Sequence, residues 1–126
     1  MALTVLIADD DTDMRLYLRS CLRGMGSRIG SVLEAADGLE ALAIVQSGSI
    51  DIVICDVIMP GLGGHGLRRA IRDDPELRNL PVLLISGEPR GAPTGPADGF
   101  LAKPFNAGQL ETALFEQFPH FNLEAQ

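Results

Sequence analysis

Five short apolar runs recur along the chain, and most of the intervals between them have the spacing of helices that are apolar on one side. The runs are residues 3–8, 31–35, 51–55, 81–85 and 99–102. Runs this continuous are typical of parallel strands that are buried on both faces. Strands that alternate with helices predict an α/β fold, in which helices cover both sides of a parallel sheet.

Helices are expected after the first, second, third and fifth runs, because each of these intervals carries start or stop signals. Asp11 or Thr12 caps the first helix, and the glycines at positions 24 and 26 end it. The second opens on the capping-box pattern of residues 37–40. The remaining stop and start signals, in chain order, are Gly48, Asp73-Asp74-Pro75, Asn106-Ala107-Gly108-Gln109 and Pro119.

The interval between the fourth and fifth runs breaks this pattern. Residues 87–98 contain six glycines or prolines among twelve positions. Inside a helix each proline costs about 3 kcal/mol and each glycine about 1 kcal/mol. Twelve residues are enough to cross between parallel strands. We therefore expect an irregular Gly/Pro-rich loop, with at most one helical turn, where a fourth helix would otherwise stand.

At 126 residues the chain is expected to form one domain, residues 1–126, with residues 119–126 as a C-terminal tail. Its net charge of −7 and its lack of a basic stretch argue against nucleic acid or an anionic membrane as a partner. No apolar run approaches the roughly 20 residues of a membrane span, and the amino terminus lacks a signal peptide. Cys21 and Cys55 are expected as reduced core thiols, which predicts a cytoplasmic protein.

Polar side chains follow four of the five expected strands. Asp9 and Asp10 follow the first, Asp56 the third, Ser86 the fourth and Lys103 the fifth. The carboxyl ends of parallel strands form one edge of the sheet, where open α/β sheets place their ligand sites. The sequence therefore predicts that three carboxylates, a hydroxyl and an ammonium group share one crevice.

This set of groups indicates phosphoryl transfer. Three carboxylates close together repel one another, and a hard cation such as Mg²⁺ relieves that repulsion. With a metal and Lys103 present, Asp56 can act as a nucleophile toward a phosphoryl group. The metal and the ammonium group offset charge on the transferring oxygens, and the Ser86 hydroxyl can donate to one of them.

The chain resembles the receiver domain of bacterial two-component response regulators over essentially its whole length. The pieces that carry the resemblance are Ile7-Ala8-Asp9-Asp10-Asp11, Ala36-Asp37-Gly38, Ile54-Cys55-Asp56-Val57-Ile58-Met59-Pro60, Ile85-Ser86-Gly87 and Phe100-Leu101-Ala102-Lys103-Pro104-Phe105. The resemblance implies a flavodoxin-like, doubly wound, five-stranded parallel sheet in the order 2-1-3-4-5. It also implies a phosphorylation-dependent switch in phosphorelay signal transduction, with a sensor histidine kinase or a histidine phosphotransfer protein as the phosphoryl donor.

The resemblance further implies roles for individual residues of the crevice. Asp56 is the phosphoacceptor by this comparison. Asp9, Asp10, Asp56 and the backbone carbonyl of Ile58 are the implied ligands of Mg²⁺ or Mn²⁺. The protein is then not an enzyme in the usual sense, since it catalyses only its own phosphorylation and dephosphorylation.

The remaining implied roles concern the response to phosphorylation. Ser86 matches the switch hydroxyl of the family, Phe100 the switch aromatic and Lys103 the phosphate-sensing lysine. The bond between Lys103 and Pro104 is expected to be cis, as it is in that family. The partners are expected to be the phosphoryl donor and an effector protein of unknown identity, with the chain itself a monomer or a weak homodimer.

Two departures from the family pattern stand out. The loop after Asp56 has Gly63-Gly64 where the family commonly has an acidic residue before a glycine, and we expect a looser loop from this change. The larger departure is the missing fourth helix, which in the family helps to form the face that reads out phosphorylation. We hypothesise that residues 87–98 form a segment that orders or repacks when Asp56 is phosphorylated.

Other functions remain open on the sequence alone. A degenerate receiver would bind partners without phosphorylation, which the missing helix makes conceivable. A haloacid-dehalogenase-like phosphatase would use Asp9 as the nucleophile and Asp11 as the acid/base, although Asp13 stands where that family has Thr or Val. A stand-alone signalling switch is the leading interpretation, with a piece of a hybrid kinase or of a longer regulator as its alternative.

Overall fold

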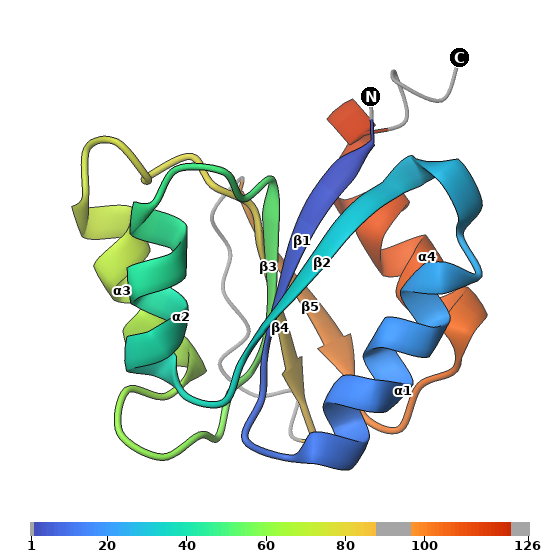
Figure 1. Cartoon of the computed structure of the whole chain (residues 1–126), viewed down its shortest axis with the longest axis horizontal. Coiled ribbons are helices and arrows are strands. Elements are labelled where there is room, and N and C mark those ends of the chain that lie inside the picture. The colour runs from blue at the N-terminus through green and yellow to red at the C-terminus, as the bar shows by residue number, and fades with distance from the viewer. Residues whose placement is uncertain (1, 88–96, 122–126) are drawn as a thin grey trace.

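A computed structural model describes residues 2–87 and 97–121 of the chain. A single five-stranded sheet lies between two pairs of helices, and all its strands point downward in Figure 1. The strands are β1 (Leu3–Ala8), β2 (Ile29–Ala35), β3 (Ile52–Asp56), β4 (Val82–Ser86) and β5 (Asp98–Ala102). The helices of the described residues are α1 (Thr12–Arg23), α2 (Gly38–Gln46), α3 (Gly64–Asp73) and α4 (Ala107–Gln117), with a short 3₁₀ helix, η1 (Gly26–Arg28).

The strand order is β2-β1-β3-β4-β5, and every neighbouring pair is parallel. This confirms the predicted flavodoxin-like α/β fold and its order 2-1-3-4-5. β2 and β5 are therefore the two edge strands of the sheet. Whatever links β4 to β5 at residues 88–96 lies outside the described residues, and so does the proposed rearrangement there.

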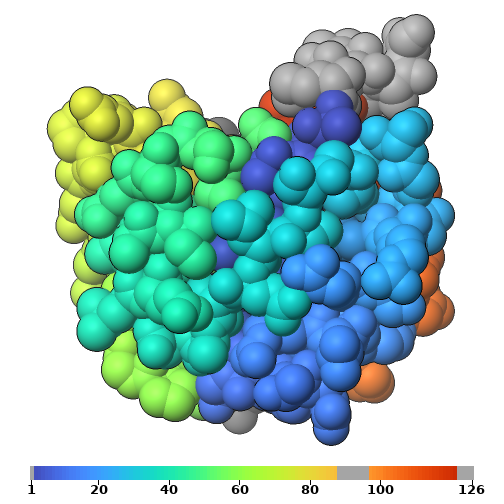
Figure 2. Space-filling model, in the orientation of Figure 1, coloured from blue at the N-terminus to red at the C-terminus, as the bar shows by residue number. Residues whose placement is uncertain are grey.

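Alternation along the strands divides the core into two layers. Val5 and Ile7 of β1 pack with α1 and α4, whereas Leu6 and Ala8 of the same strand pack with α2 and α3. Figure 2 shows the same arrangement from outside, with the edge strand β2 visible between the two helix layers. Because both faces are covered, the central strands are apolar at nearly every position before their carboxyl ends, which is why the sequence shows runs instead of alternation.

The helix starts agree with the sequence signals. Asp11, not Thr12, is the N-cap of α1, and its carboxylate accepts from the N–H of Asp13 at 2.9 Å. Asn106 forms a complete capping box with Gln109 at the start of α4. No helix among the described residues is long and apolar enough to cross a membrane.

The C-terminal end differs from the prediction. Helix α4 stops at Gln117, and residues 119–121 form one more short turn. Phe121 lies in this turn and is buried against Phe118, with a distance of 5.9 Å between the ring centroids. Of the predicted tail, Phe121 therefore belongs to the core, whereas Pro119 and His120 are exposed.

Candidate functional site

The carboxyl ends of the strands lie at the lower edge of the sheet in Figure 1, and the predicted crevice residues lie at or just after these ends in the chain. β1 and β3 are direct neighbours, with Ala8 paired to Cys55, so Asp9 and Asp56 follow adjacent positions. On the other side of β3, Asp56 pairs with Ile85, just before Ser86. The N–H of Lys103 donates to the Ser86 carbonyl at 2.8 Å, which brings the end of β5 to the same edge.

Asp56 and Lys103 form an ion pair within this edge. The Nζ of Lys103 lies 2.6 Å from Oδ2 of Asp56, and the Asp56 side chain is only 12% exposed. The other carboxylate oxygen, Oδ1, accepts from the backbone N–H of Ile58 at 3.0 Å. Both oxygens of Asp56 are thus oriented by donors, at a position that solvent still reaches.

Asp9 is the most buried acidic residue of the site, at 1% exposure. Its Oδ1 accepts from the N–H of Asp11 at 2.9 Å, and its own N–H donates to the carbonyl of Ala35 at 3.1 Å. Burial raises the pKa of Asp9, and the negative charges of Asp56 and Asp10 raise it further, against the opposing effects of the Asp11 N–H and Lys103. The acidic residues therefore lie close enough to destabilise one another's charge.

These oxygens fit a hard divalent cation. Among the described residues no three carboxylate, imidazole or thiolate groups already converge as one metal cluster. Mg²⁺, however, needs only one or two carboxylates, and waters fill its other positions. Asp9 is a desolvated carboxylate whose charge a cation would favour, while Asp10 is exposed beside it. The donor set is thus suited to Mg²⁺.

The other predicted residues lie on β4, on and after β5, and in the loop after Asp56. Ser86 is buried at the last position of β4, and Phe100 is half-buried in β5, packed against the layer of α2 and α3. The Lys103–Pro104 peptide bond is cis. Ile58 is 78% exposed, so its side chain lies at the surface next to the phosphoacceptor candidate. The roles implied for these residues stay predictions.

The glycine pair after Asp56 allows close packing. A Cβ on Gly64 would lie 2.5 Å from the carbonyl oxygen of Asp56, and one on Gly63 would lie 2.9 Å from the carbonyl oxygen of Val57. Neither contact is possible for a larger residue without a shift of the backbone. These glycines let α3 begin directly against the backbone of Asp56, and the expectation of a looser loop stays a prediction.

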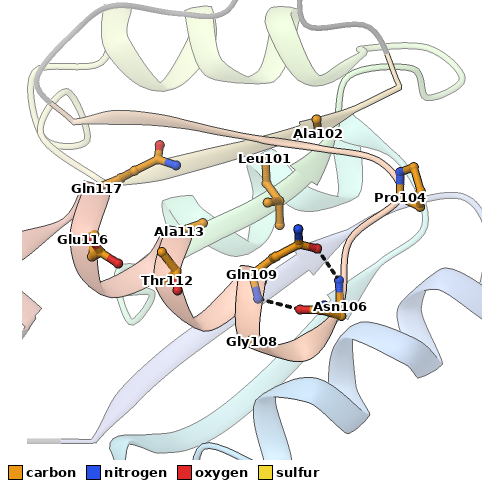
Figure 3. A pocket seen from close by; sticks show the side chains of 10 residues that line it. All are labelled: Leu101, Ala102, Pro104, Asn106, Gly108, Gln109, Thr112, Ala113, Glu116 and Gln117. Atoms are coloured by element: carbon orange, nitrogen blue, oxygen red, sulfur yellow. Dashed lines mark hydrogen bonds between the residues drawn. The ribbon is translucent and has the colours of Figure 1, made fainter.

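A cavity of about 660 Å³ lies beside the site, between the end of β5 and α4. Figure 3 shows Leu101, Asn106 and Gln117 among the residues that line it. The Gln117 amide bonds the outer edge of β5: its Oε1 accepts from the N–H of Phe100 and its Nε2 donates to the Phe100 carbonyl, both at 2.8 Å. This contact supports the strand that carries Phe100 toward Lys103.

Several polar residues that the sequence analysis did not single out also act near these strands. Arg15 of α1 donates to the backbone carbonyl of Asp9 at 2.7 Å. Arg68 and Arg72 of α3 form ion pairs with Asp98 at the start of β5. In each helix the two arginines are four positions apart in the sequence. This spacing indicates that they share one face of the helix and can bind the same group. The sequence alone does not identify the strand residue that such a pair contacts.

The cysteines agree with their expected role. Cys21 and Cys55 are buried and are not joined in a disulfide. Burial raises the pKa of the Cys55 thiol well above its ordinary value, and the charges of Asp56 and Asp9 add to this effect. Cys55 is therefore a neutral core side chain beside the site and not a nucleophile.

Comparisons with known proteins identify a family that matches most of the chain. A family model described as the response regulator receiver domain matches residues 5–115. The chain is 38% identical over 119 residues to the chemotaxis protein CheY-3 of Vibrio cholerae, covering 90% of each chain. It is also similar to the structure of a response regulator from Chloroflexus aurantiacus, with 32% identity, a TM-score of 0.81 and coverage of 94% of this chain and 99% of that one.

A further structural neighbour supports the fold alone. It is the receiver domain of a sensor histidine kinase from Pseudomonas aeruginosa, which holds a magnesium ion in its own active site cleft. The identity is 24% and the TM-score is 0.79, with coverage of 94% of this chain and 99% of the neighbour.

Proposed function

The chain belongs to the response regulator receiver domain family, and from that premise we propose that it is switched by phosphorylation of Asp56 in the presence of Mg²⁺. As a receiver it is a phosphorylation-dependent signalling switch. The proposed donor is a phosphohistidine on a sensor histidine kinase or on a histidine phosphotransfer protein. The proposed output is a change in binding to an effector protein, or onward relay of the phosphoryl group.

The observation that carries this proposal is the pairing of Asp56 with Lys103. A partly buried carboxylate at the end of a central strand lies 2.6 Å from an ammonium group, and the backbone N–H of Ile58 bonds its second oxygen. A nucleophile of this kind needs fixed direction and a cation that can offset charge on an incoming phosphoryl group. Asp56 has both in the folded chain.

The proposed step is a displacement at phosphorus. An oxygen of Asp56 forms a new bond to the phosphorus, and the bond from phosphorus to the histidine nitrogen breaks. The imidazole leaves with the electron pair and takes up a proton. Lys103 would then contact a phosphoryl oxygen in place of the free carboxylate, and the Ser86 hydroxyl would donate to another phosphoryl oxygen as the switch contact.

We propose Asp9, Asp10, Asp56 and the Ile58 carbonyl as the protein ligands of the metal, with Mn²⁺ as a substitute for Mg²⁺. The metal would supply positive charge against the transferring oxygens. The role of Asp9 in this set is supported by its burial and its raised pKa, because a desolvated carboxylate gains most from a neighbouring cation.

The proposal also covers the response to phosphorylation, the oligomeric state and the location of the protein. Phe100 is proposed to respond to the Ser86 contact, and the chain is proposed to act as a cytoplasmic monomer or weak homodimer. Reduced Cys21 and Cys55 agree with a cytoplasmic setting. A role of residues 87–98 in this response stays a proposal, since most of that segment lies outside the described residues.

The test is to treat the protein with acetyl phosphate and Mg²⁺, and to locate the adduct by mass spectrometry. We expect one added PO₃ unit, about 80 Da, on Asp56. Asp56→Asn should abolish this adduct while leaving the fold intact, because Asn keeps the shape of the side chain. EDTA should prevent labelling of the wild-type protein.

The other outcomes identify other functions. An adduct on Asp9 would support the phosphatase, although the Asp11 carboxylate that this mechanism needs is already the N-cap of α1. No adduct on any residue, in a folded protein with Mg²⁺, would support a binding module that works without phosphorylation. Either result would contradict the function proposed for Asp56.

A further inference from the structure

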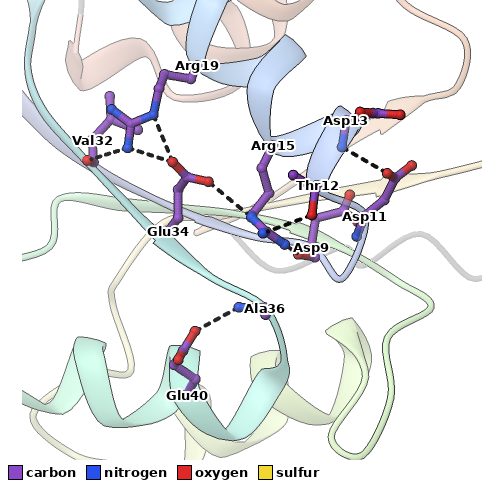
Figure 4. Close-up of polar contacts among 10 residues, drawn as sticks. All are labelled: Asp9, Asp11, Thr12, Asp13, Arg15, Arg19, Val32, Glu34, Ala36 and Glu40. Carbon is purple, nitrogen blue, oxygen red and sulfur yellow. Dashed lines mark hydrogen bonds and ion pairs between the residues drawn. The ribbon is translucent and has the colours of Figure 1, made fainter.

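The loop that carries Asp9 and Asp10 is held from one side by an arginine. Nη1 of Arg15 donates to the backbone carbonyl of Asp9 at 2.7 Å, and Nη2 lies 3.3 Å from the hydroxyl of Thr12. The Arg15 side chain is 17% exposed, so this contact is largely shielded from water. Figure 4 shows the guanidinium group between the loop and Glu34.

Arg15 is itself held in place from β2. Its Nε donates to Oε1 of Glu34 at 3.0 Å. The other oxygen of Glu34 accepts from Nε of Arg19 at 2.8 Å, and Nη2 of Arg19 donates to the Val32 carbonyl at 3.1 Å. These side chains therefore form one chain of contacts, which runs from Arg19 through Glu34 and Arg15 to the acidic loop (Figure 4). Such a chain limits the rotamers that Arg15 can adopt.

The position of the contact gives it a specific consequence. The carbonyl of Asp9 belongs to the peptide bond that joins Asp9 to Asp10. A peptide unit is planar, so fixing its oxygen fixes the direction in which the chain continues to Asp10. The N–H of Asp9 is bonded to Ala35 on the other side, at 3.1 Å. The backbone of Asp9 is thus held on both sides of its Cα, by Ala35 at its N–H and by Arg15 at its carbonyl.

We propose that Arg15 is a positioning residue for Mg²⁺ binding, which acts by fixing the peptide unit between Asp9 and Asp10. This inference rests on the metal ligands of the proposed function. Arg15 does not contact the ion; it holds the backbone of the ligands and places a positive charge behind them. Groups that orient metal ligands in this way commonly change metal affinity by 10-fold to 100-fold when they are replaced.

The test is the Mg²⁺ affinity of purified variants, measured by titration calorimetry without any phosphoryl donor. We expect Arg15→Gln to weaken Mg²⁺ binding about 10-fold or more. Arg15→Lys should recover part of the loss, because an ammonium group can still donate to the Asp9 carbonyl. The matched comparison is Arg19→Gln, which removes the far end of the contact chain but leaves the bonds of Arg15 to Asp9 and Glu34, so it should weaken Mg²⁺ binding less.

A second readout separates positioning from a general loss of structure. In Arg15→Gln the amide resonances of Asp10 and Asp11 should shift in the metal-free protein, while those of β4 stay in place. Unchanged Mg²⁺ affinity in Arg15→Gln would overturn the proposal, and so would an equal loss in Arg19→Gln. If Asp56 is not labelled by acetyl phosphate in the wild type, the proposed function fails by a separate measurement, while the affinities still decide the role of Arg15.

Discussion

Both edge strands of the sheet are held by ion pairs between helix arginines and one carboxylate, but the two clusters lie in different environments. At the β2 edge, Arg15 and Arg19 of α1 bind the single carboxylate of Glu34. At the β5 edge, Arg68 and Arg72 of α3 bind the single carboxylate of Asp98. In both cases two arginines four positions apart reach from a helix to one acidic residue on an edge strand.

The two clusters differ in burial. The side chain of Asp98 is fully buried, whereas that of Glu34 is 32% exposed. Arg72 also donates to three backbone carbonyls, those of Arg78, Leu80 and Ala97, at 3.2, 2.7 and 3.0 Å. It therefore ties the loop before β4 and the residue before β5 to the same helix.

This difference indicates different functions for the same residue types. An exposed ion pair contributes little to folding, but it can still fix the direction of a side chain. In a buried ion pair, removing either partner is strongly destabilising, because the other charge is left buried without compensation. We therefore expect the Asp98 cluster to stabilise the fold at the β5 edge, and the Glu34 cluster to adjust the geometry of the acidic loop.

The largest expected effect is that of Asp98→Asn. This change leaves two arginines without their counter-charge in a buried site, and we expect it to lower the free energy of unfolding by about 3 kcal/mol. Equilibrium unfolding in urea measures the loss. Glu34→Gln is the matched control, and an equal loss in both variants would show that burial does not separate the two clusters.

Within the buried cluster, Arg68 and Arg72 should contribute unequally to the free energy of unfolding. Nη2 of Arg68 lies 2.6 Å from Oδ2 of Asp98, yet within the described part of the chain neither that oxygen nor Nε of Arg68 has a well-directed hydrogen bond. Arg72 has both a directed bond to Oδ1 and its three carbonyls. In the same urea experiment, Arg72→Gln should cost more than Arg68→Gln, by about 1 kcal/mol. A larger loss in Arg68→Gln would contradict this ranking.

The pH dependence of stability offers a second comparison. Burial raises the pKa of Asp98, but the ion pairs with Arg68 and Arg72 outweigh it and hold the pKa below its ordinary value. The same balance, with Arg19 and Arg15, lowers the pKa of Glu34. A lowered folded pKa adds stability above the unfolded value of about 4, and this stability is lost as the pH falls through the folded pKa.

The expected result is a fall in the melting temperature of the wild type on acidification from about pH 5 toward pH 2. Asp98→Asn should remove a large part of this dependence, because Asn does not titrate. Glu34→Gln should remove a smaller part, since its carboxylate is better solvated. Thermal melts followed by circular dichroism at each pH give the comparison, and identical pH profiles for the two variants would contradict it.

Gln117 provides a milder test at the β5 edge. Its amide bonds both backbone groups of Phe100, in the way that a neighbouring strand would. We expect Gln117→Ala to lower the free energy of unfolding by about 1 kcal/mol and to speed hydrogen exchange at the Phe100 amide. Glu116→Ala, which changes an exposed neighbour on α4, is the control. Unchanged exchange at Phe100 would mean that other contacts hold this edge.

Much of this molecule could be predicted from local sequence patterns. The strands were evident because buried parallel strands are continuously apolar, and the crevice followed because parallel strands end at one edge. The arginine clusters were not predicted, since Glu34 lies 19 positions from Arg15 and Asp98 lies 26 from Arg72. Partners so far apart are chosen by the packing of whole elements, which no local pattern reports.

Two smaller features that the sequence analysis did not predict have the same origin. The close approach of Gly63 and Gly64 to the backbone of Val57 and Asp56 depends on where α3 packs, and no local pattern indicated it. Phe121 was assigned to a tail because Pro119 ends the helix pattern, but its ring is buried against Phe118. In both cases tertiary packing, which no local pattern reports, decided the role of the residue.

The smallest expected effect on stability belongs to Glu34→Gln, and it tests the β2 edge most directly. An exposed ion pair is worth about 0 to 1 kcal/mol, so unfolding in urea should change by less than that. Mg²⁺ binding should nevertheless weaken, because Arg15 loses the charged partner that fixes its rotamer. If Glu34 acts only through Arg15, adding Glu34→Gln to Arg15→Gln should leave Mg²⁺ affinity where Arg15→Gln alone puts it. Fully additive losses would mean that Glu34 influences the acidic loop by a separate route, and the contact chain would then not explain the site's geometry.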